Sequence, residues 1–191
     1  MVTQGRDALF GEVVNGEMIL NDAGEMIVRW WLELPNKFPN VNVDIFVVMP
    51  NHFHGIIFIA DSVGDEIVGD DLRVVPGLGG DDNGGGEKGE HGGSPQPIGS
   101  PRRTDSPQQR PNAPLSQMIQ WFKTMTTNEY IRGVKNLGWK PFNGKVWQRD
   151  YYEHIIRNSS AADRIARYIE FNPARWNEDK ENSAQTGKIP P

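Results

Sequence analysis

A stretch of 53 residues, from 61 to 113, most constrains how this chain can fold. It holds twelve of the 21 glycines and no aromatic residue, so it cannot bury enough apolar surface to offset the entropy lost on ordering. We interpret it as a flexible, mostly disordered insert, because structureless loops of this length are uncommon inside compact domains. The sequence then predicts one folded domain of roughly 130 residues, made from residues 1–60 and 114–177 and followed by a loose polar tail over 178–191.

Several elements are predicted before the insert. Residues 9–14 form a short strand-like run, and residues 21–34 carry apolar side chains at helical spacing after a polar N-cap, Asn21 or the aspartate that follows it. Residues 41–49 and 53–59 are β-branched and aromatic runs separated by a short turn. This pattern is typical of an antiparallel hairpin.

Three more elements are predicted after the insert. Pro114 can serve as the first residue of an amphipathic helix, and residues 145–147 suggest a short strand. Ser160 and Asp163 form a plausible capping box that opens a last helix, which stops at Pro173. This order of elements predicts an α+β fold, in which helices cover one face of an antiparallel sheet.

Composition excludes several classes of protein. The chain has no cysteine, so disulfide frameworks, thiolate zinc sites and cysteine nucleophiles are excluded, and any metal must be bound through nitrogen or oxygen. No apolar run is long enough for a membrane-spanning helix, and the N-terminal residues lack the pattern of a signal peptide. We therefore expect a cytoplasmic protein without a membrane partner.

The net charge of −5 is unevenly distributed along the chain. Residues 1–60 carry three basic and seven acidic groups, residues 61–113 carry five and ten, and residues 114–191 carry twelve and eight. The last segment is therefore net basic. A local positive field can bind phosphate in an acidic protein, because charges beyond about 10 Å are largely screened.

Two histidines stand at the start of the second strand of the predicted hairpin. Side chains alternate between the faces of a strand, so His52 and His54 project to the same side while Phe53 faces apolar packing. Two imidazoles on one face can bind one divalent cation, and Gly55 after them leaves room for a ligand or a phosphate backbone to approach. The alternative is two unrelated polar residues on a hairpin, which the spacing alone does not exclude.

The last predicted helix carries a polar stripe. Arg164, Tyr168 and Asn172 are spaced four residues apart, so they lie on one face of the helix. A guanidinium, a hydroxyl and an amide in this arrangement could serve as phosphate clamp, nucleophile and metal ligand. The alternative is a structural tyrosine with its hydroxyl at the surface, which is the commoner situation for tyrosines.

A third feature is the interleaving of aromatic and basic residues in the segment VWQRDYYEHIIRN. Tyr151 and Tyr152 lie between Arg149 and Arg157, an arrangement that single-stranded nucleic acid favours. These two tyrosines also compete with Tyr168 for the role of nucleophile. Equally, the aromatic side chains could complete the core while the arginines are solvated.

Taken together, these residues resemble the HUH single-tyrosine transposases of insertion sequences, especially the REP-associated tyrosine transposase branch. The resemblance covers most of the chain outside the insert and tail and rests on four blocks in order: FGEVVNGEMILNDAG, VVMPNHFHGIIFI, KVWQRDYYEHIIRN and RYIEFNPARW. It implies a ferredoxin-like antiparallel sheet, with the histidines on a central strand and the tyrosine on a C-terminal helix packed nearby.

The resemblance also assigns roles to individual residues. It implies that His52 and His54 are the metal-binding pair, that Asn172 is the third metal ligand and that Tyr168 is the catalytic tyrosine. The metal would be magnesium or manganese, and no nucleotide cofactor is implied. The residues that we expect to contact DNA are Lys123, Arg149, Arg157 and Arg164.

The implied activity is that of a transposase that cleaves and rejoins single-stranded DNA. The tyrosine oxygen attacks phosphorus to give a 5′-phosphotyrosine and a free 3′-hydroxyl, and a second 3′-hydroxyl later completes strand transfer. The implied partner is single-stranded or hairpin DNA, and a homodimer is an open alternative to a monomer. Two other functions stay open: a catalytically inactive module that binds hairpin DNA, and a hydrolase of small phosphoesters that forms no covalent adduct.

This sequence departs from the family pattern in two places. Members of the family usually begin with an apolar strand, of which only residues 1–4 are present here, so we expect most of the first strand to be lacking. The insert at 61–113 is much longer than the usual connection, which is tolerable because the entropy of loop closure grows only logarithmically with length. Val74 and Val75 offer one point at which the insert could be pinned.

Overall fold

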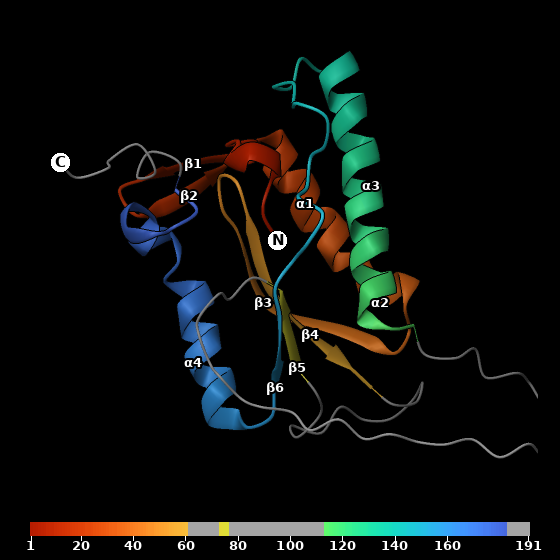
Figure 1. The fold of residues 1–191 in the computed structure, drawn as a ribbon, viewed down its shortest axis with the longest axis vertical. Coiled ribbons are helices and arrows are strands. Elements are labelled where there is room, and N and C mark those ends of the chain that lie inside the picture. The colour runs from red at the N-terminus through yellow and green to blue at the C-terminus, as the bar shows by residue number, and fades with distance from the viewer. Residues whose placement is uncertain (61–72, 77–112, 183–191) are drawn as a thin grey trace, which may run out of the picture. The chain divides into compact units, whose positions relative to one another are not determined.

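The computed structural model describes residues 1–60, 73–76 and 113–182, with the backbone alone for 73–76. The fold is α+β, as the sequence predicts, with antiparallel strands packed against helices (Figure 1). Its elements in chain order are η1 (Gln4–Arg6), β1 (Gly11–Val14), β2 (Glu17–Leu20), α1 (Asp22–Leu32), α2 (Leu34–Lys37), β3 (Val41–Val48), β4 (Phe53–Ile59), β5 (Arg73–Pro76), α3 (Leu115–Asn136), β6 (Glu153–Ile156), α4 (Ser159–Glu170) and η2 (Pro173–Glu178), where η marks a 3-10 helix.

The main sheet is antiparallel and has the strand order β3-β4-β5-β6. β3 and β4 pair from Val41↔Ile59 to Val48↔Phe53, which confirms the predicted hairpin. β5 pairs with β4 on one side and with β6 on the other. A short piece of the predicted insert, which contains Val74 and Val75, is therefore part of the sheet. The rest of that insert, apart from Ala113, lies outside the described residues.

The N-terminal residues follow the same edge of β4 as β5. Val2 forms an antiparallel bridge with His52, and the Met1 amino group donates a hydrogen bond to the Phe53 carbonyl at 2.8 Å. On its other side this segment makes a single bridge, from Thr3 to Trp147. Residues 1–3 and β5 thus lie one after the other along the same edge of β4.

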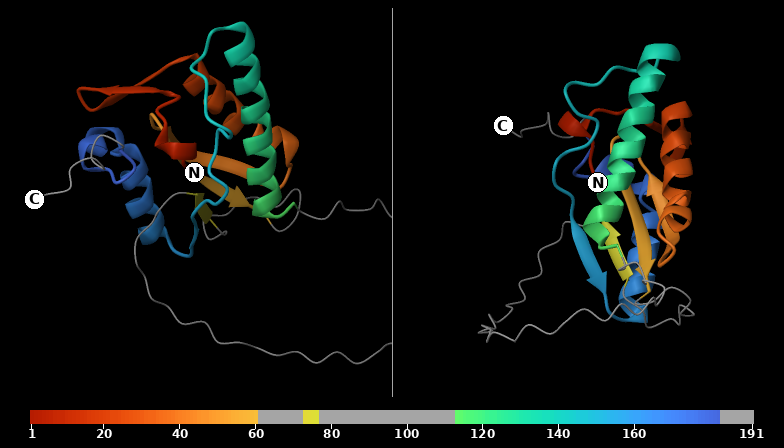
Figure 2. Two further views of the ribbon diagram at one scale, coloured as in Figure 1. Left: turned by 45° about the horizontal axis from the view of Figure 1, so that its top comes forward. Right: turned by 90° about the vertical axis from the view of Figure 1, so that its right-hand side faces the viewer.

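Helices cover both faces of the sheet, which corrects the expectation of helices on one face. α1 and α3 lie side by side over the face formed by Phe53 and Ile57 (Figure 2). α4 packs its Ile165 and Ile169 against Ile56 on the opposite face. The reason is that β4 is apolar on both faces, as in strands that are buried on two sides.

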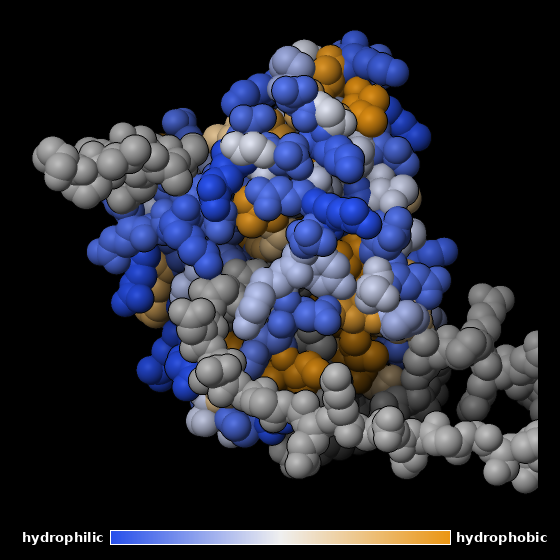
Figure 3. Space-filling model, in the orientation of Figure 1, coloured by the Kyte–Doolittle hydropathy of each residue, from blue (hydrophilic) through white to orange (hydrophobic). Residues whose placement is uncertain are grey.

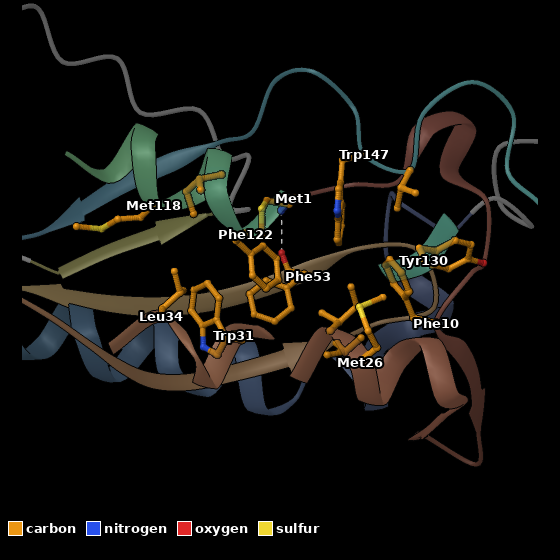
Figure 4. Packing of buried hydrophobic residues seen from close by; sticks show 14 of the residues in the cluster. Met1, Phe10, Met26, Trp31, Leu34, Phe53, Met118, Phe122, Tyr130 and Trp147 are labelled. Atoms are coloured by element: carbon orange, nitrogen blue, oxygen red, sulfur yellow. Dashed lines mark hydrogen bonds between the residues drawn. The ribbon is translucent and has the colours of Figure 1, made fainter. Parts of the chain in front are cut away.

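Aromatic rings fill the core on the α1 and α3 side of the sheet. Trp31 packs beside Phe53 and Phe122 (Figure 4), with its ring centroid 4.6 Å from that of Phe53 and 5.6 Å from that of Phe122. The buried indole N–H of Trp147 donates a hydrogen bond to the Thr126 hydroxyl at 2.9 Å. This core holds β4 rigidly from one face, so the residues on its other face have defined positions.

The starts of two helices test the predicted caps. Asn21 caps α1 as expected, since its side chain accepts a hydrogen bond from a backbone N–H in the first turn. The predicted capping box of Ser160 and Asp163 is wrong, because α4 begins at Ser159 with Asn158 as its N-cap. The Asn158 side chain accepts from Ala161 N–H at 2.8 Å, and the Ser160 hydroxyl donates to Asn158 instead.

Strand positions also shifted in the C-terminal half. The strand predicted at 145–147 is reduced to the single bridge of Trp147, and the regular strand there is β6, which the sequence did not predict. β6 is exposed along most of its length, with only Ile156 buried, so it lacks the apolar alternation that identifies a strand. None of the helices in the described parts of the chain is long and apolar enough to cross a membrane.

Candidate metal and nucleophile site

The two histidines lie at the start of β4, on the face that α4 covers. His52 is completely buried and His54 is 3% exposed, with ring centroids 4.8 Å apart. Phe53 between them points into the aromatic core on the other face. The alternation of side chains along β4 therefore brings both imidazoles to one side, as the sequence predicts.

Asn51 determines which nitrogen of His52 is available. Its side-chain oxygen lies 2.9 Å from His52 Nδ1, while its side-chain nitrogen donates to the carbonyls of Arg6 and Glu181. Since the amide nitrogen is used elsewhere, the oxygen faces the ring and Nδ1 carries the proton. Burial, followed by the nearby N-terminal amino group, lowers the pKa of His52 to about 3. His52 is therefore a neutral imidazole with its lone pair on Nε2, the form that binds metals.

Tyr168 lies on α4, and Asn172 is the second residue after the end of this helix; both approach the histidines. The Tyr168 ring centroid lies 5.4 Å from that of His54. Burial raises the pKa of Tyr168, as does the negative charge of Asp179, whereas hydrogen bonding from Asn172 acts in the opposite direction. Asn172 is 3% exposed and is the residue just before η2, where its side chain makes no capping hydrogen bond. The structure thus brings Tyr168, Asn172 and both histidines together.

Unpaired polar atoms at this site test whether it fits a metal. The described residues contain no group of three histidine, aspartate or glutamate side chains placed to hold one. Among these residues, however, the buried Nε2 of His52 and Oδ1 of Asn172 have no hydrogen-bond partner. Buried polar atoms without partners are rare and call for an explanation. Imidazole nitrogen and amide oxygen are both ligands of divalent cations, so His52, His54 and Asn172 fit such an ion.

The sequence did not predict that the segment with Trp176, Asp179 and Glu181 lies beside the histidine site. The Trp176 ring centroid lies 5.8 Å from that of His52, and Asp179 Oδ2 lies 3.7 Å from His52 Nε2. Glu181 forms an ion pair with Arg6 at 2.7 Å. These acidic residues belong to the predicted loose tail, and their polar composition gave no signal of a packed position. The described part of that tail, to residue 182, packs against the domain.

Gly55 does not have the role that the sequence suggested. A Cβ added there would lie 2.6 Å from Trp31 Cζ2 and 3.0 Å from Phe53 Cε1, so this position faces the aromatic core. The same alternation that directs His54 toward α4 directs Gly55 away from it. Gly55 therefore gives space to the Trp31 indole, and the idea that it clears a path for a ligand or phosphate is corrected.

The competing tyrosines and the predicted DNA-binding residues lie at other positions. Tyr151 lies beneath Lys123 of α3, with Nζ 5.1 Å from the ring centroid, and Tyr152 is 43% exposed. Lys123 also donates to the carbonyls of Gln148 and Arg149. Lys123 and Arg149 are thus brought together. The other two candidates are exposed: Arg157 lies just before α4, and Arg164 lies on that helix.

The described residues thus form an antiparallel α+β domain in which two buried histidines lie beside a tyrosine of α4. A profile of the family described as "Transposase IS200 like" matches residues 108–172. An uncharacterized protein of Haemophilus influenzae is 31% identical over 180 residues, which cover 93% of this chain and 79% of that protein. No solved structure matches. The chain belongs to the IS200-like transposase family.

Proposed function

We propose that this protein is an HUH transposase of the REP-associated tyrosine branch. It cleaves and rejoins single-stranded or hairpin DNA through a 5′-phosphotyrosine intermediate in DNA transposition. The observation that carries the proposal is the position of Tyr168 beside His54, on the face of the sheet where His52 is buried. Membership in a transposase family supports DNA as the substrate.

Tyr168 is the proposed nucleophile. Its hydroxyl oxygen bonds to the scissile phosphorus while the bond from phosphorus to the 3′-oxygen breaks. The phenol releases one proton to solvent and the leaving 3′-oxygen takes one up, so no net proton is consumed. Because the ester keeps the energy of the phosphodiester, the 3′-hydroxyl of another strand can displace Tyr168 and rejoin the DNA.

His52, His54 and Asn172 are the proposed ligands of a magnesium or manganese ion. When bound, the ion polarises the scissile phosphate and stabilises the charge that develops on its oxygens. Asn51 keeps the Nε2 lone pair of His52 directed into the site by its contact with Nδ1. Two imidazole ligands suit manganese better than magnesium, which prefers oxygen.

The proposal is tested by trapping the covalent intermediate. The protein is incubated with labelled single-stranded hairpin oligonucleotides and manganese, and adducts are separated by denaturing electrophoresis. Wild type should form an adduct, and Tyr168→Phe should form none while binding DNA almost unchanged, because it loses one hydroxyl and no charge. Tyr152→Phe removes the same hydroxyl from an exposed tyrosine and should retain the adduct. An adduct in Tyr168→Phe would move the nucleophile to another residue.

The second candidate function is a catalytically inactive module that binds hairpin DNA. The observation that favours it is that the described residues contain no group of three histidine, aspartate or glutamate side chains placed to hold a metal. Binding of hairpin DNA without any adduct, over a range of manganese and magnesium concentrations, would support this function. Turnover of small phosphoesters without an adduct would instead indicate a hydrolase.

A further inference from the structure

A groove lies between α3 and the extended segment from Phe142 to Tyr151, on the face of the sheet opposite the histidines. Its volume is about 560 Å³, within the range of roughly 300–1,000 Å³ that is usual for small-ligand sites and sufficient for a nucleotide. Figure 3 shows this face, where hydrophobic residues are visible between mainly hydrophilic ones. The floor is apolar, since Val146 and Trp147 line it and both are buried.

The groove is basic although the protein as a whole is acidic. Lys123, Lys145 and Arg149 line it, and none of its described lining residues is an aspartate or glutamate. Lys145 and Arg149 are exposed and can reach a ligand. Asp150 lies close enough to interact with Lys123, but it is not among the lining residues. The surface therefore favours an anion such as a phosphodiester.

Aromatic and amide side chains complete the lining. Tyr151 and Phe142 present half-buried rings on which a base can stack. Gln120, Asn128 and Gln148 also line the groove, and amide side chains can donate to and accept from the edge of an unpaired base. A groove that combines cations, aromatic rings and amides has the features that recognise a nucleotide in a single strand.

We propose that this groove binds an unpaired nucleotide of the single-stranded DNA substrate. The inference rests on the proposed function, because it assumes a DNA strand. Its phosphate contacts Lys145 and Arg149, and its base lies over the apolar floor beside Tyr151. The groove lies on the opposite face of the sheet from the histidines, and its lining residue Trp147 pairs with Thr3, next to Val2, which pairs with His52. It is therefore a binding site that positions the strand and takes no part in bond breaking.

Binding is measured by fluorescence anisotropy with labelled single-stranded 20-mers in the Tyr168→Phe protein, with chelator present. Lys145→Ala with Arg149→Ala should weaken binding by about tenfold or more, and should lower the slope of log affinity against log salt by about 1.4, or 0.7 for each phosphate contact. The matched control is Arg132→Ala with Lys135→Ala, which removes two exposed charges of α3 outside the groove. It should change affinity less than about twofold.

A steric variant separates the groove from general electrostatics. Thr124 is an exposed lining residue, so Thr124→Trp fills the groove without changing charge, and should weaken binding while leaving the salt slope unchanged. The inference is overturned if both double variants weaken binding equally, or if Thr124→Trp binds as tightly as its parent. It is also overturned if free dTMP competes as well as the 20-mer, since the groove would then be a mononucleotide site.

Different results would refute the inference about the groove and the proposed transposase function. Loss of binding in the groove variants, with no adduct in wild type, would retain the groove and reject the transposase chemistry. An adduct in wild type, with DNA binding unaffected by the groove variants, would reject the groove alone. The anisotropy measurement needs neither metal nor cleavage, so the two results are independent.

Discussion

Gly55→Ala tests whether this glycine serves core packing or ligand approach. The added Cβ would lie 2.6 Å from Trp31 Cζ2 and 3.1 Å from Phe46 Cβ, closer to the indole than non-bonded carbon atoms can approach. Trp31 is completely buried and is in contact with Phe53 and Phe122, so its ring has no free space into which to move.

The magnitude follows from two opposing effects. Overpacking a well-filled core typically costs about 1–3 kcal/mol. Alanine also restricts the unfolded chain more than glycine does, which recovers about 0.4–1 kcal/mol. We therefore expect Gly55→Ala to lower the free energy of unfolding by about 1–2 kcal/mol, equivalent to a fall of roughly 3–10 °C in Tm for a domain of this size.

Thermal and urea denaturation of the variant measure this loss, and the adduct assay follows activity in the folded protein. Trp31→Phe removes the atom that the new Cβ would meet, so Gly55→Ala in that background should have a much smaller effect, with a coupling of about 1 kcal/mol. Adduct formation should persist below the lowered Tm. A Gly55→Ala protein with unchanged Tm but no adduct would refute the packing argument and restore the role in ligand approach.

Three further predictions concern other contacts. Thr126→Val leaves the buried Trp147 N–H without an acceptor and should lower the free energy of unfolding by about 1–3 kcal/mol, whereas Thr126→Ser should not, as measured by urea denaturation. Asn158→Ala removes the cap of α4 and should cost about 0.5–2 kcal/mol; unchanged urea and thermal midpoints would contradict its capping role. Asp179→Asn removes a negative charge that raises the pKa of Tyr168. At saturating manganese the rise of adduct rate with pH should shift to lower pH, so that the rate at a fixed pH below that pKa increases, and an unshifted profile would contradict the electrostatic effect.

Local periodicity explains which features of the fold could be predicted. The β3–β4 hairpin follows from two apolar β-branched runs, and the alternation along β4 placed both histidines on one face. Helical spacing likewise identified α1 and α3, because their apolar positions recur every three to four residues. These patterns depend only on neighbours in the chain. Tyr168 and His54, in contrast, belong to different elements, α4 and β4. Before the structure, only the resemblance to a known family suggested that they lie side by side.

Features that depend on distant contacts could not be predicted. The packing of α4 on the second face of the sheet follows from Ile56, which looks no different in sequence from Ile57 on the first face. Asp179 lies against His52 although its surroundings in the sequence are polar throughout. Gly55 misled the prediction because a glycine beside histidines has the same appearance whether it clears space for a ligand or for the indole of Trp31.

The histidines and the tyrosine lie together in space although the insert separates them in the sequence. The place where the insert begins explains how this is possible. The predicted insert follows β4, which ends at Ile59, whereas His52 lies immediately before the start of that strand. Seven residues at about 3.3 Å each separate the two ends by roughly 23 Å. Tyr168 and Asn172 come from beyond the insert, and α4 brings them to the histidine end of β4. The length of the chain between residues 60 and 113 can therefore vary without altering the geometry of the histidines and the tyrosine, provided that β5 still pairs with β4 and β6 and that α3 and α4 still pack on opposite faces of the sheet.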